Sequence, residues 1–521
     1  MSRSLCPNRE RLDYRTKPGE MTESSPNRNV HSGTTIYSLP PEILTHIFSL
    51  AVLGQPCLIQ DCPDPPYLEL SQKDNYCPDN ISHVCSLWRC IVTRLPSLWP
   101  HIDIALNHPL NPRLVARAKV FAARAGRTPL NIHIFDPDIE HAQRLRRFML
   151  EFQGRPMYTI SRMDPNTTNG FQFSPANPLH IRSLDFNFKL RKGLRSSHMS
   201  ALEYFLAKCT PGVLTHYSMQ IHVRTLSAFI EPADDPRTHD SVLLAIHSQH
   251  FENVWLGITH LRLNNLCPHW GSKAYHRLVE LRIGKRVPTI LEAQFVNILR
   301  SSPGLRVLHI ETIVEDLSAP GDPIVPVSLE ELEDLKINDR SELDFTACGE
   351  ILRWIAPGPN PLQLTFNGHP SEGAMLFCTR SNITRFFGEA FTQESLTDII
   401  RRCSRLEMLA LNAGYFEVKN LHSILCPLDQ RHMVGVVPKT RVDTLYLVNF
   451  LVLPLDDLVN AVEEYSVQRL ILRNCSLSYD SEKGVKETKD PLAIRRLLST
   501  VDKCSIVEYL GERCSLDPEG W

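Results

Sequence analysis

The sequence predicts an α/β protein in which a small all-helical unit is followed by a curved, mostly parallel sheet with helices on its convex side. Three observations predict this fold class. A helix-start signal and a wide apolar face occur together near residue 40, a doubled-leucine strand pattern recurs later, and amphipathic helices precede several of these strands. The length of 521 residues exceeds that of one ordinary domain, which indicates several domains or a repeat array.

Residues 1–37 are expected to form a disordered arm. This stretch is rich in Ser, Arg, Asn and Pro, and its few large apolar side chains cannot bury enough surface to offset the chain entropy.

A short helix is predicted to begin at Pro40 and Pro41. The prolines preset φ at a helix entrance, and Glu42 places a carboxylate at the positive end of the helix dipole. Apolar residues then recur at helical spacing, at Leu39, Ile43, Leu44, Ile47, Phe48 and Ala51. This apolar face is too wide for so short a helix, and we expect another surface to cover it. The alternative interpretation is the first core helix of an ordinary domain.

A second amphipathic helix over 81–92 and a Leu98-Trp99 pair follow. Together with the Leu-Pro-Pro-Glu-Ile-Leu opening at residue 39, the Ile47-Phe48 pair and the Val84-Cys85-x-x-Trp88-Arg89 helix, they resemble the F-box family. The resemblance implies a helical domain over 38–100 whose apolar face docks on a Skp-type adaptor, which a cullin scaffold holds in a ubiquitin ligase.

The resemblance also implies roles for single residues. The positions carried over as adaptor-facing are Leu39, Pro40, Ile43, Leu44 and Ile47. Phe48, Val84 and Trp88 are expected to pack inside the unit. A proline-rich insertion at 54–78 departs from the family, which usually has a short connection there.

Residues 101–136 are expected to connect the two domains. Leu114 to Ala125 reads as a helix that Gly126 ends, and Leu130 to Phe135 reads as a short strand.

Residues 137–521 carry a degenerate repeat. An L-x-x-L-x-L-like strand pattern starts at Ile181, Leu214, Ile258, Leu278, Leu305, Leu332, Leu406, Val442 and Val467. An Asn closes several of these strands, at Asn187, Asn338, Asn412 and Asn474, where it is expected to bond the backbone of the outgoing turn. Central leucines at 261, 281, 308 and 335 give steps of 20, 27 and 27 residues, typical of leucine-rich repeats. A further strand is expected over 361–366.

These features favour an irregular leucine-rich-repeat solenoid. A doubly wound sheet would also alternate helices and strands, but it would not repeat the doubled leucine with a trailing Asn. Within each L-x-L pair the intervening residue points to the concave face. That row is Asp185, Arg262, Arg282, His309, Lys336, Ala410, Tyr446 and Ile471, of which Arg262, Arg282, His309, Lys336 and Tyr446 are candidate target-binding residues. Its mixed charge suits a protein partner.

Composition indicates which classes of partner and which cellular compartments to expect. With 56 basic and 58 acidic side chains the formal net charge is −2, so no nucleic-acid partner is expected. The longest apolar run is far shorter than a membrane helix of about 18 residues needs, so no membrane partner is expected. Fifteen cysteines without a pairing pattern fit reduced thiols in the cytoplasm, the nucleus or both.

Neither a metal nor a cofactor is expected. The cluster of Cys57, Cys62, Cys77, Cys85 and Cys90 with His83 invites a zinc interpretation, but its spacings lack a C-x-x-C knuckle. No phosphate-binding loop, nucleophile elbow or H-E-x-x-H helix occurs, and we expect no enzymatic activity.

The leading hypothesis is a substrate-recognition subunit of a Skp-cullin-F-box type ubiquitin ligase. It would bind the adaptor through the helical unit and an unknown target protein through the repeats. The alternatives are a leucine-rich-repeat scaffold with no ligase role, and a hydrolase or transferase of irregular α/β topology.

Overall fold

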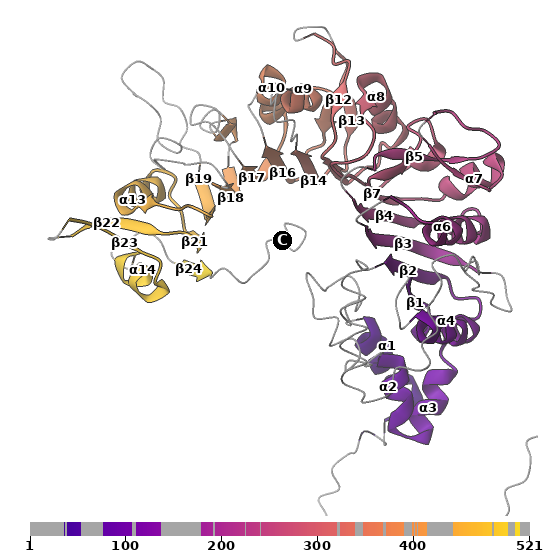
Figure 1. Cartoon of the computed structure of the whole chain (residues 1–521). Helices are drawn as coiled ribbons and strands as arrows, with labels where there is room; N and C mark the ends of the chain where they lie inside the picture. The colour runs from indigo at the N-terminus through magenta and orange to yellow at the C-terminus, as the bar shows by residue number, and fades with distance from the viewer. Residues whose placement is uncertain are drawn as a thin grey trace, which may run out of the picture.

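The computed structural model describes residues 36, 39–53, 77–106, 111–136, 179–190, 193–223, 226–239, 241–319, 324–338, 347–367, 371–389, 399–400, 402–403, 405–413, 441–481, 484–498 and 506–510. The chain is a mixed α/β protein with a large, mostly parallel sheet, which confirms the predicted class (Figure 1). The expected arm over 1–37, apart from residue 36, and nearly all of the proline-rich insertion lie outside the described residues.

A small helical unit comes first. It contains α1 (Pro41–Leu53), α2 (Cys77–Val84), α3 (Ser86–Thr93) and a 3-10 turn, η2 (Pro96–Leu98). The Sγ atom of Cys85 accepts a hydrogen bond from the backbone N–H of Trp88, so this cysteine caps α3. Leu44 and Phe48 of α1 are buried, and the Phe48 and Trp88 rings lie 4.8 Å apart.

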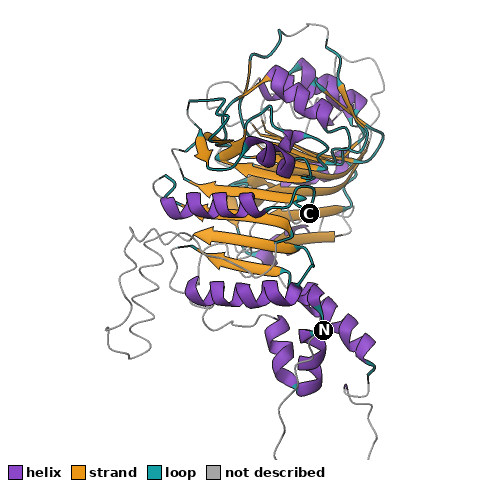
Figure 2. Ribbon diagram, turned by 90° about the vertical axis from the view of Figure 1, so that its right-hand side faces the viewer, coloured by secondary structure: helices purple, strands orange, loops and turns teal. Residues whose placement is uncertain are grey.

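Trp99 joins the helical unit to the sheet. Its fully buried indole donates a hydrogen bond from Nε1 to the carbonyl of Val92, at 2.9 Å. The same ring meets Phe121 of α4 (Asn111–Ala125) edge-on at 4.9 Å, and the Arg124 guanidinium lies 4.2 Å from its centre. Figure 2 shows the helical unit at one end of the stack of strands, next to this helix. Among the described residues, one hydrophobic core therefore extends from Leu44 of the helical unit through the sheet to Ile494.

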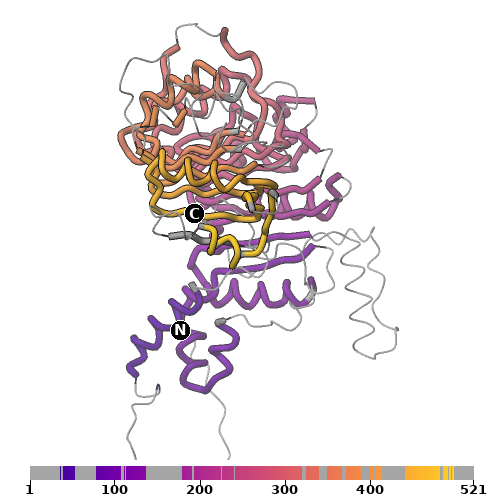
Figure 3. Tube along the Cα trace, turned by 90° about the vertical axis from the view of Figure 1, so that its left-hand side faces the viewer, coloured from indigo at the N-terminus to yellow at the C-terminus, as the bar shows by residue number. Residues whose placement is uncertain are grey.

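The main strands pair in parallel, each with the next one along the chain in the following order. They are β1 (His101–Ala105), β2 (Leu130–Asp136), β3 (Ile181–Lys189), β4 (His216–His222), β7 (His260–Asn264), β9 (Glu280–Ile283), β11 (Val307–Ile310), β14 (Asp334–Asn338), β16 (Leu362–Asn367), β17 (Ile383–Glu389), β18 (Arg405–Asn412), β19 (Arg441–Val448), β21 (Arg469–Arg473) and β24 (Ile506–Leu510). Figure 3 shows them as stacked layers.

All nine pattern-derived strands belong to this sheet, and the strand expected over 361–366 is β16. The expected boundary at residue 137 differs from the pairing, because β1 and β2 already belong to the same sheet. The sequence patterns missed β1, β17 and β24, which lack the doubled leucine.

Helices cover the outer side of the curved sheet, and none of the helices that the structure describes lies on its inner side (Figure 1). In the described part of the chain they include α6 (Ser196–Lys208), α7 (Ser248–Trp255), η3 (Lys273–Tyr275), α8 (Glu292–Ser301), α9 (Ala347–Leu352), α10 (Glu372–Arg380), α13 (Leu455–Glu464) and α14 (Pro491–Leu498). These helices are amphipathic and turn their apolar side toward the sheet. For example, α8 buries Phe295, Ile298 and Leu299 against the leucines of the strands.

Short strands complete the fold. β5 (Ala228–Pro232), β6 (Val242–Leu244) and β8 (Leu266–Pro268) pair beside β7, and two-stranded pairs form from β10 (Ile290–Leu291) with β12 (Val314–Glu315) and from β13 (Val327–Leu329) with β15 (Ile355–Pro357). A three-stranded sheet contains β20 (Leu453–Pro454), β22 (Leu477–Ser481) and β23 (Gly484–Thr488).

Asparagines stabilise the turns that leave several strands. Asn265, Asn449 and Asn474 have positive φ values of 73°, 58° and 50°, a conformation that Asn tolerates better than most residues. The Asn474 amide donates to Asn449 at 2.8 Å, and the Asn449 amide donates to Asn412 at 3.0 Å. Asn265 donates to the backbone carbonyls of Val223 and Leu226. For Asn474 the bond is thus to the neighbouring asparagine, rather than to the turn backbone as expected.

Candidate partner-binding surfaces

The first helix carries an exposed apolar stripe. Ile43, Ile47 and Leu50 are 48%, 39% and 56% exposed, and their spacing places them on one face of α1. The adjacent α2–α3 corner also exposes two large apolar side chains, Val84 and Leu87. We call Ile43, Ile47 and Leu50 the α1 apolar stripe. An exposed apolar surface of this kind on a small helical unit is suited to a protein partner.

The expected adaptor-facing residues differ in their exposure to solvent. Pro40, Ile43 and Ile47 are exposed, whereas Leu39 is half-buried against the core. Leu44 was expected to face the adaptor, and this expectation is wrong because its side chain is fully buried. The physical reason is helical: Leu44 lies about 100° around α1 from Ile43, on the inward side that it shares with Phe48.

Two further positions correct the sequence interpretation. Val84 was expected to be internal and is exposed, whereas Phe48 and Trp88 pack inside the unit as expected. Leu50 was missed as a surface residue, although its position seven residues after Ile43 was the available signal.

A continuous row of side chains crosses the inner face of the sheet. In strand register it runs Asp103, His133, Asp185, Ser218, Arg262, Arg282, His309, Lys336, Thr365, Phe387, Ala410, Tyr446 and Ile471. The flanking leucines of the pattern belong to the main core on the helical side. The prediction that the intervening residues share one face is therefore confirmed, and we call this face the concave face.

The middle of the concave face carries paired charges. Glu280 Oε1 lies 2.6 Å from Arg262 Nε and 2.9 Å from Arg282 Nε. Burial alone would raise the pKa of Glu280, but the two arginines outweigh it and hold that pKa below its usual range.

The two remaining basic candidates in this part of the face, His309 and Lys336, also contact carboxylates. His309 Nε2 lies 2.8 Å from Asp334 Oδ2, and Lys336 Nζ lies 2.6 Å from Glu311 Oε1. All four basic candidates for target binding, Arg262, Arg282, His309 and Lys336, thus lie in contact with carboxylates, so this part of the face is polar.

The far end of the concave face is apolar. Ala410, Tyr446, Val448 and Ile471 form a buried cluster that is separate from the main core, with Phe387 packed against it. We call these five residues the concave apolar cluster. Tyr446 was expected to be open to a target, but its side chain is buried, with 1% exposed. A partner can reach this tyrosine only if the atoms that shield it move away.

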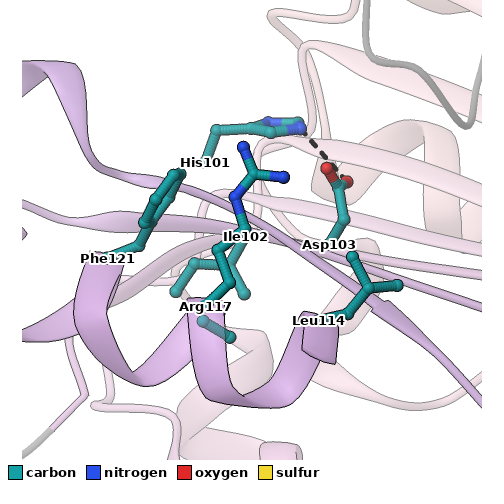
Figure 4. A pocket seen from close by; sticks show the side chains of 7 residues that line it. His101, Ile102, Asp103, Leu114, Arg117 and Phe121 are labelled. Atoms are coloured by element: carbon teal, nitrogen blue, oxygen red, sulfur yellow. Dashed lines mark ion pairs between the residues drawn. The ribbon is translucent and has the colours of Figure 1, made fainter. Parts of the chain in front are cut away.

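A small pocket lies at the opposite end of the sheet, between β1 and α4. It is lined by His101, Ile102, Asp103, Leu114, Arg117, Ala118 and Phe121 (Figure 4). His101 Nε2 lies 3.1 Å from Asp103 Oδ1. Burial, with smaller contributions from His133 and Arg117, lowers the pKa of His101 to about 3, so its imidazole is neutral. No residue that lines the pocket carries a hydroxyl or thiol nucleophile.

The buried thiols are also held protonated. Burial raises the pKa of Cys209 and of Cys378 to about 12 and that of Cys475 to about 11. Within the described ranges, no group of three or more His, Cys, Asp or Glu residues could hold a metal ion. Of the cysteines in the zinc interpretation, Cys57 and Cys62 fall outside those ranges, and Cys85 caps α3.

No helix among the described residues has the length and apolar character needed to cross a membrane. Comparison with family models and with curated proteins gave no match to this chain. The two surfaces, one helical and one on the sheet, therefore carry the functional argument.

Proposed function

We propose that this chain is the substrate-recognition subunit of a Skp-cullin-F-box type ubiquitin ligase. In this proposal, residues 39–100 form an F-box-like unit that docks on a Skp-type adaptor. The curved sheet is an irregular leucine-rich-repeat solenoid that holds a target protein. The observation that carries the proposal is the α1 apolar stripe, which the rest of the described chain leaves exposed.

The stripe has the geometry of a helix that lies in a partner's groove. Its three side chains are spaced i, i+4 and i+7, which is the anchor pattern of this recognition mode. Fully burying an Ile or Leu side chain contributes about 1.5–3 kcal/mol, so the half-exposed anchors each have roughly 1 kcal/mol left to gain. A few such anchors commonly supply most of the binding energy of an interface.

The solenoid assignment is supported by the strand order. Parallel strands follow one another along the chain, helices lie outside them, and the doubled leucines align from strand to strand, as Leu281, Leu308 and Leu335 do. Each unit then contacts its neighbours only, which is the organisation of repeat proteins.

The proposed mechanism is proximity without chemistry on this chain. A rigid bridge places the lysines of a bound target near a charged ubiquitin carrier and so raises their effective concentration. The continuous core through Trp99 supports such rigidity, because the helical unit and the first strands share buried side chains.

Adaptor binding by matched charge variants tests the proposal. Leu50 of the stripe and Leu376 of α10 are 56% and 55% exposed, so Leu50→Asp and Leu376→Asp introduce the same charge at equally exposed helical leucines. We expect purified full chain to pull down a recombinant Skp-type adaptor and a cullin, Leu50→Asp to weaken capture at least tenfold, and Leu376→Asp to leave it unchanged.

Other outcomes would redirect the assignment. Equal capture by both variants would remove the stripe from the interface. No adaptor capture by the unmodified chain would reject the ligase role and leave a scaffold that binds partners through its repeats.

A further inference from the structure

Two histidines stack against each other at the start of neighbouring strands. A Thr-His pair opens β4, as Thr215-His216, and another opens β7, as Thr259-His260. The two histidines lie opposite each other in register, and their rings are 4.1 Å apart with an angle of 8° between their planes. Each lies two residues before a member of the concave row, so both belong to the concave face, the inner side of the sheet in Figure 1. His216 is exposed there.

The threonines determine which ring nitrogen carries the proton. In both pairs the threonine Oγ1 lies close to the histidine Nδ1, at 2.8 Å in the first pair and 2.9 Å in the second. A hydroxyl has one proton to donate, and these hydroxyls donate theirs to the carbonyls of Arg182 and Thr215, at 3.3 and 3.2 Å. Each hydroxyl therefore accepts a hydrogen bond from Nδ1–H, and the lone pair of the neutral ring is on Nε2. Among the described residues, none hydrogen-bonds either Nε2 atom.

Basic side chains outnumber acidic ones around this pair of rings. Arg182 is exposed, and its Nε donates to the side chain of Asn131 on β2 at 3.3 Å, which places its guanidinium on the same face. In residues 181–185, 216–220, 260–264 and 280–283 the charged side chains are Arg182, Arg262, Arg282, Asp185 and Glu280. Three positive and two negative charges give a net charge of +1 while the histidines are neutral. This part of the concave face is therefore complementary to an acidic partner.

The protonation of His216 responds to such a partner. Burial, followed by the charges of His260 and of the two arginines Arg182 and Arg262, holds the pKa of His216 below its usual value, and Glu280 only partly opposes them. The ring is therefore mostly neutral at pH 7 in the free chain. A carboxylate next to Nε2 favours a proton on that nitrogen and accepts the resulting charge-assisted hydrogen bond. Binding of an acidic group then takes up a proton, so the affinity rises as the pH falls from the pKa of the bound ring to that of the free ring.

We propose that the concave face binds an acidic segment of the target protein at His216 and His260. One carboxylate of the segment accepts a hydrogen bond from Nε2 of His216, and adjacent carboxylates face Arg182 and Arg262. The inference rests on the proposed function, which assigns the concave face to a target, and it adds the chemistry of the segment that is bound. Peptide binding and adaptor capture are separate measurements, so failure of one is distinguishable from failure of the other.

A peptide titration at graded pH tests the proposal. Fluorescently labelled hexaglutamate is titrated with the full chain at pH 8, 7 and 6, and its anisotropy is measured; hexaglutamine is the uncharged control. Glutamate side chains have an ordinary pKa of about 4.3, so the peptide stays negatively charged throughout. We expect hexaglutamate to bind about threefold or more tightly at pH 6 than at pH 8, and hexaglutamine not to bind.

Single variants of the full chain assign the effect to the stacked pair. His216→Gln should remove most of the pH dependence and weaken binding at pH 6. Arg182→Gln should weaken binding at every pH and leave the pH dependence in place. His247→Gln is the matched control, because His247 caps α7 and its side chain is 75% exposed, and it should bind as the unmodified chain does. Circular dichroism shows that each variant is folded.

Three results would overturn the proposal. They are no binding of hexaglutamate by the unmodified chain, equal affinity at pH 6 and pH 8, and an unchanged pH dependence in folded His216→Gln.

Discussion

Replacing Trp99 tests whether the helical unit and the sheet share one core. The buried indole contacts Phe121 and Arg124 of α4 and donates a hydrogen bond to Val92 of α3, so Trp99→Ala removes contacts on both sides of the junction at once. A buried Trp or Phe replaced by Ala costs about 3–5 kcal/mol, and a lost hydrogen bond adds about 1 kcal/mol. We therefore expect the free energy of unfolding to fall by about 4–6 kcal/mol.

A conservative variant and a matched control separate the contributions. Trp99→Phe keeps a ring against Phe121 but loses the hydrogen bond and some volume, so we expect a loss of about 2 kcal/mol. Trp88 is only half-buried, and its Nε1 has no hydrogen-bond partner among the described residues. Trp88→Phe should therefore cost less than about 1 kcal/mol.

Urea unfolding followed by circular dichroism measures these losses, and hydrogen exchange locates them. In Trp99→Ala, amides of α3 and of α4 should lose protection together. A cost below about 1 kcal/mol, equal costs for Trp99→Phe and Trp88→Phe, or loss of protection confined to α1–α3 would refute a shared core.

Two further predictions concern the sheet. Burial lowers the pKa of His101 to about 3 and that of His133 to about 4, so between pH 6.5 and 5 the unfolded chain binds protons that the folded chain does not, and stability falls as the pH falls. His133→Gln should reduce that slope by about 1 kcal/mol per pH unit between pH 6.5 and 5 in urea unfolding at graded pH, and an unchanged slope would contradict it. Asn449→Ala should cost about 2 kcal/mol, because it removes two side-chain hydrogen bonds and places a Cβ-bearing residue without them at φ 58°. Asn449→Gly should cost less in the same assay, since glycine tolerates this φ, and the reverse order would disprove the reasoning.

Periodicity carried much of the fold prediction. The offset between the paired leucines is a local property of a strand with one buried face, so nine strands could be placed before any contact was known. By contrast, β17 reads Ile-Thr-Arg-Phe-Phe-Gly-Glu and lacks that offset, and it is a strand because β16 and β18 pair with it on both sides. Strand pairing is non-local, so sequence patterns miss strands of this kind.

Surface residues were predicted less completely than strands. The apolar residues of α1 mark both an inward side and an outward side, and periodicity does not say which is which. The packing of neighbouring helices determines which side is buried. Helices α2 and α3, the latter with Trp88, cover Leu44 and Phe48, so that Ile43, Ile47 and Leu50 remain exposed. Tyr446 was placed correctly on the concave face, but only tertiary packing shows that it is shielded there.

The amino-acid sequence by itself determined the fold class of the protein. It also determined, for most strands, which side chains face the core and which form the row on the inner face. These follow from helix capping and from the alternation of side chains along a strand, which act over a few residues. Only the tertiary structure decided which apolar side chains are exposed, which charges are paired and how the helical unit joins the sheet at Trp99. Those properties depend on segments distant along the chain, and burial and ion pairing exist only once such segments meet.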